Sequence, residues 1–232
     1  MVHLPTAAGP ARPGSVRREE DPPSPVSLYG QSKREGELAA ARWAARVPMT
    51  VVRPGVVFGP GCREFRPMLS TIYRLRMHPV PGWHRPPLSY IHVSDLVEVL
   101  IAAAERGRRV EPLQESRPGE TTPAGFYFAE SGEHPDWGEF GRMFARAMGR
   151  PRAAVVPLPA PIPWCVGAFS EAAGRLRGRA PVLNVDKIRE AHARSWACSS
   201  AWTRRDLGFQ PSQPLESRVR DTARWFQDHG WL

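Results

Sequence analysis

The chain has 232 residues, of which 41% are hydrophobic and 24% are charged, and its formal net charge is +9. This length predicts one sizeable core, or one and a half domains of ordinary size. Arginines are interspersed with acidic residues, as in RREED and DKIRE, so the positive charge does not predict a nucleic-acid-binding surface. The longest apolar stretch, Val155–Phe169, contains four prolines, which argues against a membrane span.

Three cysteines, Cys62, Cys165 and Cys198, are far apart in the chain and lack the spacing of metal ligands. The first residues do not show the basic and then apolar order of a signal peptide. These features predict a cytoplasmic protein without a metal site.

Strand and helix patterns alternate along the chain, which predicts an α/β fold. Residues 10–25 are rich in proline and charge and predict a surface loop. A helix is expected to begin after Ser27 as its N-cap and to end before Pro48. A strand at Met49–Arg53 follows, then a turn at FGPG, and residues 65–75 keep helical spacing.

The second half of the chain continues this alternation. LSYIHV predicts a strand that leads into a helix capped by Ser94 and ended by Gly107. FYFA predicts another strand, and Asp136 opens a capping box for a helix that ends at Gly149. AAVVPL and WAC predict short strands, and the last helix is expected in PLESRVRDTARWFQDHG.

Tyr29 and Lys33 form a Tyr-x-x-x-Lys pair near the start of the first expected helix. Residues four apart share a helix face, so both side chains are expected to point into one cleft. A tyrosine hydroxyl, with an ordinary pKa of about 10, is a poor base at neutral pH, and a nearby ammonium favours the phenolate. With four tyrosines and two lysines in the chain, chance would produce about 0.03 such pairs.

Three further segments accompany this pair in a recognisable order. EDPPSPVSLYGQSKREGE, TVVRPGVVFGPG and SYIHVSDLVEVLIAA together resemble the extended short-chain dehydrogenase/reductase family, also called NAD-dependent epimerase/dehydratase, and its 3β-hydroxysteroid dehydrogenase-like branch. The closing RRDLGFQPSQPLESRVRDTARWFQDHGWL is similar to the end of that family, so the resemblance runs from about Val2 to the C-terminus. It implies a Rossmann-like, doubly wound parallel sheet, N-terminally truncated, with a smaller C-terminal α/β substrate lobe.

The resemblance also implies roles for individual residues. Tyr29 would be the catalytic acid or base, and Lys33 would lower its pKa and hold the nicotinamide ribose of NAD or NADP. The Thr6 hydroxyl would bind the reacting oxygen, although a serine pair is usual there. The backbone of Pro54, Gly55 and Val56 would contact the nicotinamide ring. His92 and Asp95 are expected to be structural, as a strand-end histidine and a first-turn helix charge.

The glycine-rich motif of a dinucleotide-binding fold is missing from the sequence: neither G-x-G-x-x-G nor G-x-x-G-x-x-G occurs in it. At ~30 residues per βαβ unit, roughly 100 residues of the family's first half are absent. Residues 1–60 would then be the C-terminal part of the Rossmann domain and residues 61–232 mainly the substrate lobe, with residues 88–107 returning to the sheet. Cofactor binding is expected to be weak or absent without the missing segment, and the open sheet edge allows pairing into a homodimer.

The substrate is partly indicated by Leu88. Sugar-nucleotide members of the family often carry arginine at this position, and an apolar residue cannot donate a hydrogen bond to a phosphate. The resemblance therefore implies an oxidoreductase that acts on an apolar secondary alcohol or ketone. The expected pocket-lining residues are Trp83, Phe65, Trp164 and Phe169. Two alternatives stay open: a nucleotide-sugar epimerase or dehydratase, and an inactive remnant or non-enzymatic interaction protein.

Overall fold

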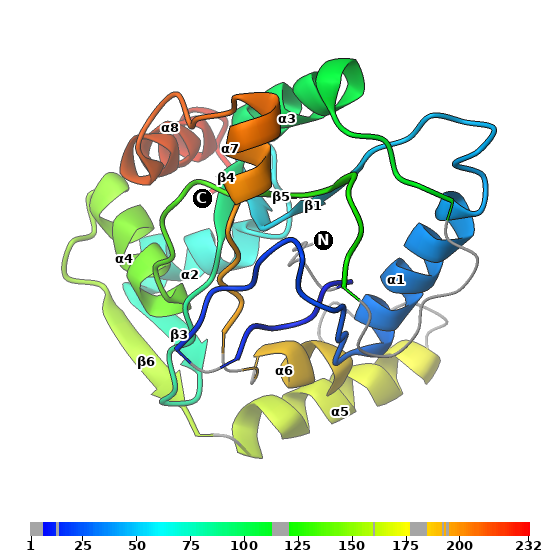
Figure 1. Ribbon diagram of the computed structural model, residues 1–232. Coiled ribbons are helices and arrows are strands. Elements are labelled where there is room, and N and C mark those ends of the chain that lie inside the picture. Colours follow the sequence, from blue (N-terminus) through cyan, green and yellow to red (C-terminus); the bar gives the residue numbers. More distant parts are fainter. Residues whose placement is uncertain are drawn as a thin grey trace.

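The computed structural model describes residues 7–12, 14–112, 121–159, 161–176, 185–191, 193 and 195–232. Helices and strands alternate within these ranges (Figure 1). The elements are α1 Leu28–Ala41, β1 Val51–Pro54, β2 Val56–Phe58, α2 Arg66–Leu75, β3 Met77–Pro81, β4 Tyr90–His92, α3 Val93–Arg106, β5 Phe126–Ala129, α4 Trp137–Ala147, β6 Ala154–Leu158, α5 Pro161–Leu176, α6 Val185–Ala191, α7 Ala201–Leu207 and α8 Leu215–Asp228.

The described strands form parallel pairs: β1 with β5, β2 with β4, and β3 with β6. Helices cover both faces of the β1–β5 pair, because successive side chains of a strand point to opposite faces. Val51 packs with Ala41 of α1, whereas Val52 packs with the cluster that α3 and α7 contribute. The predicted α/β fold with parallel strands is therefore confirmed, while the division at residue 60 and the homodimer stay predictions.

The largest core lies between β2, β4 and the helices α2, α4 and α8. Its centre is aromatic: Tyr90 stacks on Phe140 with 3.9 Å between ring centroids, and Phe58 meets Phe140 edge-on at 5.3 Å. Such pairs add to the stabilisation that burial of the rings already provides. This core holds the strand ends of β2 and β4 in fixed positions.

Most of the expected elements are present. Strands β1, β4, β5 and β6 and helices α2, α3, α4 and α8 lie where the sequence predicts them. Asp136 and Glu139 form the predicted capping box, with bonds of 2.8 and 3.0 Å to each other's backbone N–H groups. No helix of the described residues is long and apolar enough to cross a membrane.

Three expectations about local structure are wrong, and two strands were missed. Helix α1 ends at Ala41, because the chain then tightens into turns in which Trp43 N–H donates to the Ala40 carbonyl. The N-cap of α3 is His92, whose Nδ1 accepts from the Ser94 N–H at 3.3 Å, so Ser94 lies inside the helix. WAC forms isolated bridges instead of a strand, and β2 and β3 were not predicted at all.

Strand β2 was missed because its reason for forming lies elsewhere in the chain. The Gly55 N–H donates to the Ala129 carbonyl of β5, whereas the next N–H, of Val56, donates to the Ser89 carbonyl beside β4. The backbone thus changes its partner strand between two consecutive residues, and the three residues after Gly55 form a new strand.

Helix α1 is tied to β1 by a buried ion pair. Glu37 of α1 accepts two bonds of 2.7 Å from Arg53, and Arg34 adds a third at 3.1 Å. Arg53 is only 5% exposed and lies over the Phe126 ring, 4.7 Å from its centroid. Two-pronged arginine–carboxylate pairs fix orientation as well as distance, so this contact sets how α1 lies on the sheet.

Candidate functional site

The Tyr29–Lys33 pair lies in the first turns of α1, whose start is defined by Ser27. The Ser27 hydroxyl accepts from the Gly30 N–H at 2.9 Å and so caps the helix, as predicted. Tyr29 is half-buried and Lys33 is exposed, and the Lys33 ammonium lies 5.2 Å from the centroid of the Tyr29 ring. The structure therefore brings the two side chains together on one face.

Two carboxylates of α6 lie at the same helix end. The Asp186 carboxylate accepts from the Leu28 N–H at 3.0 Å and from the Tyr29 N–H at 3.1 Å. Glu190 accepts a short hydrogen bond from the Ser27 hydroxyl. Carboxylates are favourable at a helix N-terminus because they meet unpaired N–H groups and the positive end of the helix dipole. Sequence reasoning missed these residues, since Asp186 and Tyr29 are 157 positions apart.

The pKa of Tyr29 lies above its ordinary value. Burial of the hydroxyl is the main cause, and the negative charge of Glu190 adds to it. A lowering of the Tyr29 pKa by Lys33 therefore stays a prediction. The ammonium of Lys33 is exposed, and water screens the attraction between an exposed charge and a phenolate.

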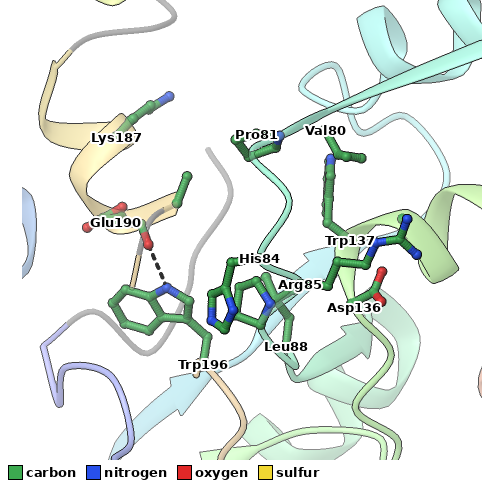
Figure 2. A pocket seen from close by; sticks show the side chains of 13 residues that line it. Val80, Pro81, His84, Arg85, Leu88, Asp136, Trp137, Lys187, Glu190 and Trp196 are labelled. Atoms are coloured by element: carbon green, nitrogen blue, oxygen red, sulfur yellow. Dashed lines mark hydrogen bonds between the residues drawn. The ribbon is translucent and has the colours of Figure 1, made fainter. Parts of the chain in front are cut away.

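An apolar cavity of about 290 Å³ lies beside α6 (Figure 2). Figure 2 shows Lys187 and Glu190 on one side of it and Val80, Leu88 and Trp137 on the other. The Trp196 indole N–H donates to the Glu190 carbonyl at 2.8 Å and holds this wall against α6. Cavities with apolar walls and a few polar groups are the usual form of a small-molecule site.

The cavity differs from the predicted one in its lining. Phe65 is part of the main core, Trp83 and Phe169 are 77% and 78% exposed, and Trp164 is also exposed, so none of the four predicted residues lines it. Their place is taken by Trp137 and Trp196. From the sequence, Trp137 is assigned only to the start of a helix and Trp196 only to a strand, so neither is predicted to line a cavity. Leu88, chosen from the sequence as a substrate-facing residue, does line the wall.

The remaining predicted residues are only partly brought to this site. The N–H groups of Gly55 and Val56 are bound to Ala129 and Ser89, and the Val56 side chain is buried in the main core. These N–H groups are therefore not donors to a ligand, and a contact of the nicotinamide with the backbone of Pro54, Gly55 and Val56 stays a prediction. Thr6 lies outside the described residues.

His92 and Asp95 have structural partners, as expected. Besides capping α3, His92 has a lowered pKa because it is buried. Asp95 pairs with Arg218 of α8 at 3.1 Å. Within the described ranges, no group of three histidines, cysteines or carboxylates is arranged to hold a metal ion.

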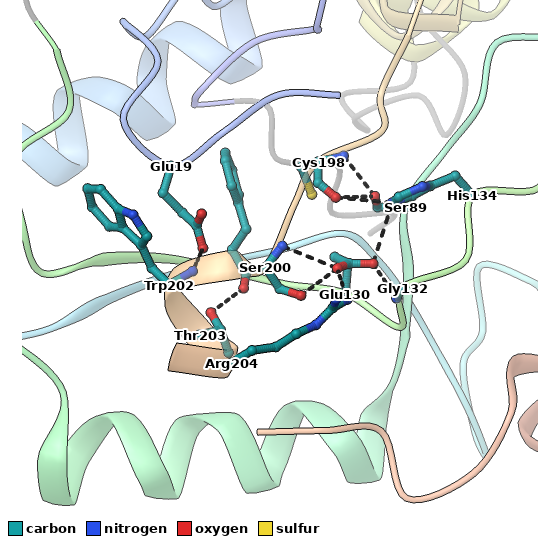
Figure 3. A network of polar contacts seen from close by, with 11 residues as sticks. Glu19, Ser89, Glu130, Gly132, His134, Cys198, Ser200, Trp202, Thr203 and Arg204 are labelled. Atoms are coloured by element: carbon teal, nitrogen blue, oxygen red, sulfur yellow. Dashed lines mark hydrogen bonds and ion pairs between the residues drawn. The ribbon is translucent and has the colours of Figure 1, made fainter. Parts of the chain in front are cut away.

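The loop that leads into α1 is anchored by a buried polar network (Figure 3). Glu19 accepts from the Trp202 N–H at 3.1 Å at the start of α7. Glu130, at the end of β5, accepts from the Ser200 N–H at 3.2 Å and from Arg204 at 3.0 Å. These bonds join the loop before Tyr29 to the C-terminal part of the chain.

Comparison with known proteins indicates one family. Residues 2–115 match the model of the NAD dependent epimerase/dehydratase family. UDP-glucose 4-epimerase of Vibrio cholerae is 23% identical over 216 residues, which are 92% of this chain and 58% of that protein. Ceramide reductase of Caulobacter vibrioides is 29% identical over 210 residues, 89% of this chain and 59% of that protein. Residues 2–115, just under half of the chain, thus match this family, and the two curated relatives extend the likeness to about nine-tenths of the chain.

The fold agrees with this likeness. The crystal structure of gox2253 superposes with a TM-score of 0.70 at 24% identity and covers 98% of this chain and 65% of its own. The chain thus spans 58% and 59% of the length of the two curated relatives. The likeness to UDP-glucose 4-epimerase and to ceramide reductase extends over 92% and 89% of this chain.

The family cofactor fits one part of this site. Lys33 is exposed beside the Tyr29 ring, where a compact ammonium can donate to both hydroxyls of a ribose. The pyrophosphate of a dinucleotide needs converging N–H groups of a glycine-rich turn and its helix. The 232-residue sequence contains no such motif.

The first prediction concerns Glu19, which is 2% exposed and whose Oε2 has no hydrogen-bond partner in the structure. Burial raises its pKa from 4.5 to about 7. The folded state therefore binds this proton more tightly than the unfolded state, so the stabilisation is complete below pH 4.5 and is lost as pH rises to about 7.

Glu19→Gln keeps an acceptor for the Trp202 N–H without the charge. Its advantage over wild type in free energy of unfolding should grow between about pH 5 and pH 8, by at most about 3 kcal/mol. Urea unfolding at both pH values measures this, with Glu20→Gln as the control for net charge. A pH-independent difference between Glu19→Gln and wild type would contradict the prediction.

The second prediction concerns Gly55. A Cβ atom there would lie 2.5 Å from the Ser89 carbonyl oxygen. Gly55→Ala should therefore destabilise the fold by about 1–3 kcal/mol, as measured by urea unfolding. The matched control is Gly36→Ala in α1, where an added Cβ meets nothing within 4 Å. That change should stabilise by about 0.5–1 kcal/mol, and equal effects at both sites would show that the close approach to Ser89 does not matter.

Proposed function

We propose that this chain carries the acid–base and substrate-binding part of an NAD(P)-dependent oxidoreductase that acts on an apolar secondary alcohol or ketone. The observation that supports it most is the Tyr29–Lys33 pair at the start of α1, held by Glu190, which also lines the apolar cavity. Ceramide reductase, a relative at 29% identity, is named for an apolar substrate.

Tyr29 would hold the proton that the reaction moves. Since its pKa is raised, the hydroxyl is protonated at neutral pH and donates to the oxygen of a ketone as that oxygen gains negative charge. In the reverse direction the phenolate accepts the proton of the alcohol. Lys33 would bind the nicotinamide ribose, and the nicotinamide, when bound, supplies the hydride acceptor or donor.

The cavity would exclude water and orient the apolar body of the substrate. Val80, Pro81 and Leu88 form its aliphatic wall, and the rings of Trp137 and Trp196 complete it. Burial of apolar substrate surface against these side chains supplies binding free energy in proportion to the area removed from water. The transfer of the proton to or from the bound substrate would then depend on Tyr29.

A nucleotide-sugar epimerase or dehydratase is the second candidate. It is favoured by Arg85 and Lys187, two cationic residues that line the same cavity, because guanidinium and ammonium groups bind diphosphates. UDP-glucose 4-epimerase is among the relatives. In this case the apolar wall at Leu88 would face the sugar or the base.

The third prediction concerns cofactor binding by the 232 residues alone. Without the glycine-rich turn, the pyrophosphate loses several charge-assisted hydrogen bonds of about 1.5–3 kcal/mol each, which weakens binding by several orders of magnitude. Calorimetric titration with oxidised and reduced NAD and NADP should therefore show weak binding or none. A micromolar dissociation constant for any of the four would contradict this expectation.

The fourth prediction concerns turnover. A strand–glycine-rich turn–helix segment, taken from ceramide reductase and joined before residue 1, should restore NAD(P) binding and reduction of an apolar ketone. Tyr29→Phe should lower kcat by roughly 10²–10⁴-fold and leave the cofactor Kd unchanged. Tyr73→Phe, on α2, is the matched control and should have no effect.

Hydroxysteroids and UDP-glucose are tested side by side in this assay. Turnover of UDP-glucose alone would favour the epimerase. Turnover that survives Tyr29→Phe would contradict the proposed role of Tyr29.

A further inference from the structure

Helix α6 touches two features that would otherwise be separate. On one side, Asp186 binds the N–H groups of Leu28 and Tyr29, and Glu190 binds the Ser27 hydroxyl. On the other side, Lys187, Glu190 and Ala191 line the apolar cavity. Glu190 belongs to both sets, and Figure 2 shows it on the cavity wall beside Trp196.

The contacts at the start of α1 form a chain of hydrogen bonds. Glu190 accepts from Ser27, whose oxygen in turn accepts from the Gly30 N–H. Asp186 spans the two N–H groups that Ser27 does not reach. The first turn of α1 is thus capped by three side chains, two of which come from the helix that forms the cavity wall.

We propose that α6 positions Tyr29: Asp186 and Glu190 fix the first turn of α1 against the wall of the cavity. Glu190 and Asp186 are then positioning residues that act through Ser27 and through the backbone. The functional meaning of this inference rests on the proposed acid–base role of Tyr29. The contacts between α6 and α1 do not depend on that role.

Charged groups reach Tyr29 from the two helices that meet here. Lys33 comes from α1, and Asp186 and Glu190 come from α6. Asp186 is also paired with Arg189 at 3.5 Å. Glu190 is buried, and burial and the charge of Asp186 raise its own pKa. A negative charge in this position disfavours the phenolate, so removing it should lower the pKa of Tyr29.

The test is an NMR titration of the 232-residue chain with ¹³C-labelled tyrosine rings, in which Tyr29→Phe assigns the Tyr29 signal. Glu190→Gln keeps an acceptor for Ser27 but loses the charge, and it should lower the pKa of Tyr29 toward its ordinary value. Glu35→Gln removes the same charge from an exposed position on α1 and should leave this pKa unchanged. Equal effects of the two variants, or no effect of Glu190→Gln, would overturn the role of Glu190.

A second measurement tests Asp186 without depending on any titration. Asp186→Ala should speed amide hydrogen exchange of Leu28 and Tyr29 by roughly tenfold, because both N–H groups lose their acceptor. Asp228→Ala, at the exposed end of α8, is the control and should not change these rates. Unchanged exchange in Asp186→Ala would overturn its positioning role.

The proposed function is tested separately with a 3-ketosteroid, androstenedione, added to the chain while tryptophan fluorescence is recorded. Failure of this probe to bind counts against the proposed substrate class, whereas the Tyr29 titration and the exchange rates decide the positioning by α6. Circular dichroism of each variant confirms that the fold is retained before either result is interpreted.

Discussion

The change of strand partner at Gly55 is the constraint on which the rest of the structure depends. Two consecutive N–H groups bind different strands, Ala129 of β5 and Ser89 beside β4, and the Ser89 carbonyl approaches so closely that only glycine fits. This junction joins the β1–β5 pair, which carries α1, to the β2–β4 pair, which carries the main core. The positions of these two strand pairs relative to each other follow from this junction.

Helix α1 is held at its start and in its middle by contacts from other segments. Arg53 binds Glu37 in its middle, and the carboxylates of α6 bind its first turn. Breaking a buried ion pair leaves an uncompensated charge, so these contacts act as fixed points. The backbone at Tyr29 is therefore held by α6, and the helix that carries it is held by β1; a fixed position of this kind is what the proposed acid–base role would require.

Local signals made much of this predictable from the sequence. The Ser27 cap, the Asp136–Glu139 capping box and the Tyr29–Lys33 spacing depend on residues within four positions of each other, and the structure has all three. What the sequence did not show depends on distant residues. Asp186 and Glu190 are identified only by where α6 packs, and the raised pKa of Tyr29 follows from burial and from the charge of Glu190. Strand β2 likewise exists because Ser89 is beside it.

The charges around the cavity favour an uncharged ligand. Arg85 and Lys187 line it, but so do Asp136 and Glu190, so residues of both charges stand in the same wall. A diphosphate would bring its negative charges close to both carboxylates, and such like-charge contacts are strongly unfavourable where water is excluded. A neutral apolar ketone has no such penalty, and its carbonyl oxygen needs only one donor. The proposal of an apolar ketone as substrate, with Tyr29 as its proton donor, is in keeping with this mixture of charges in the wall.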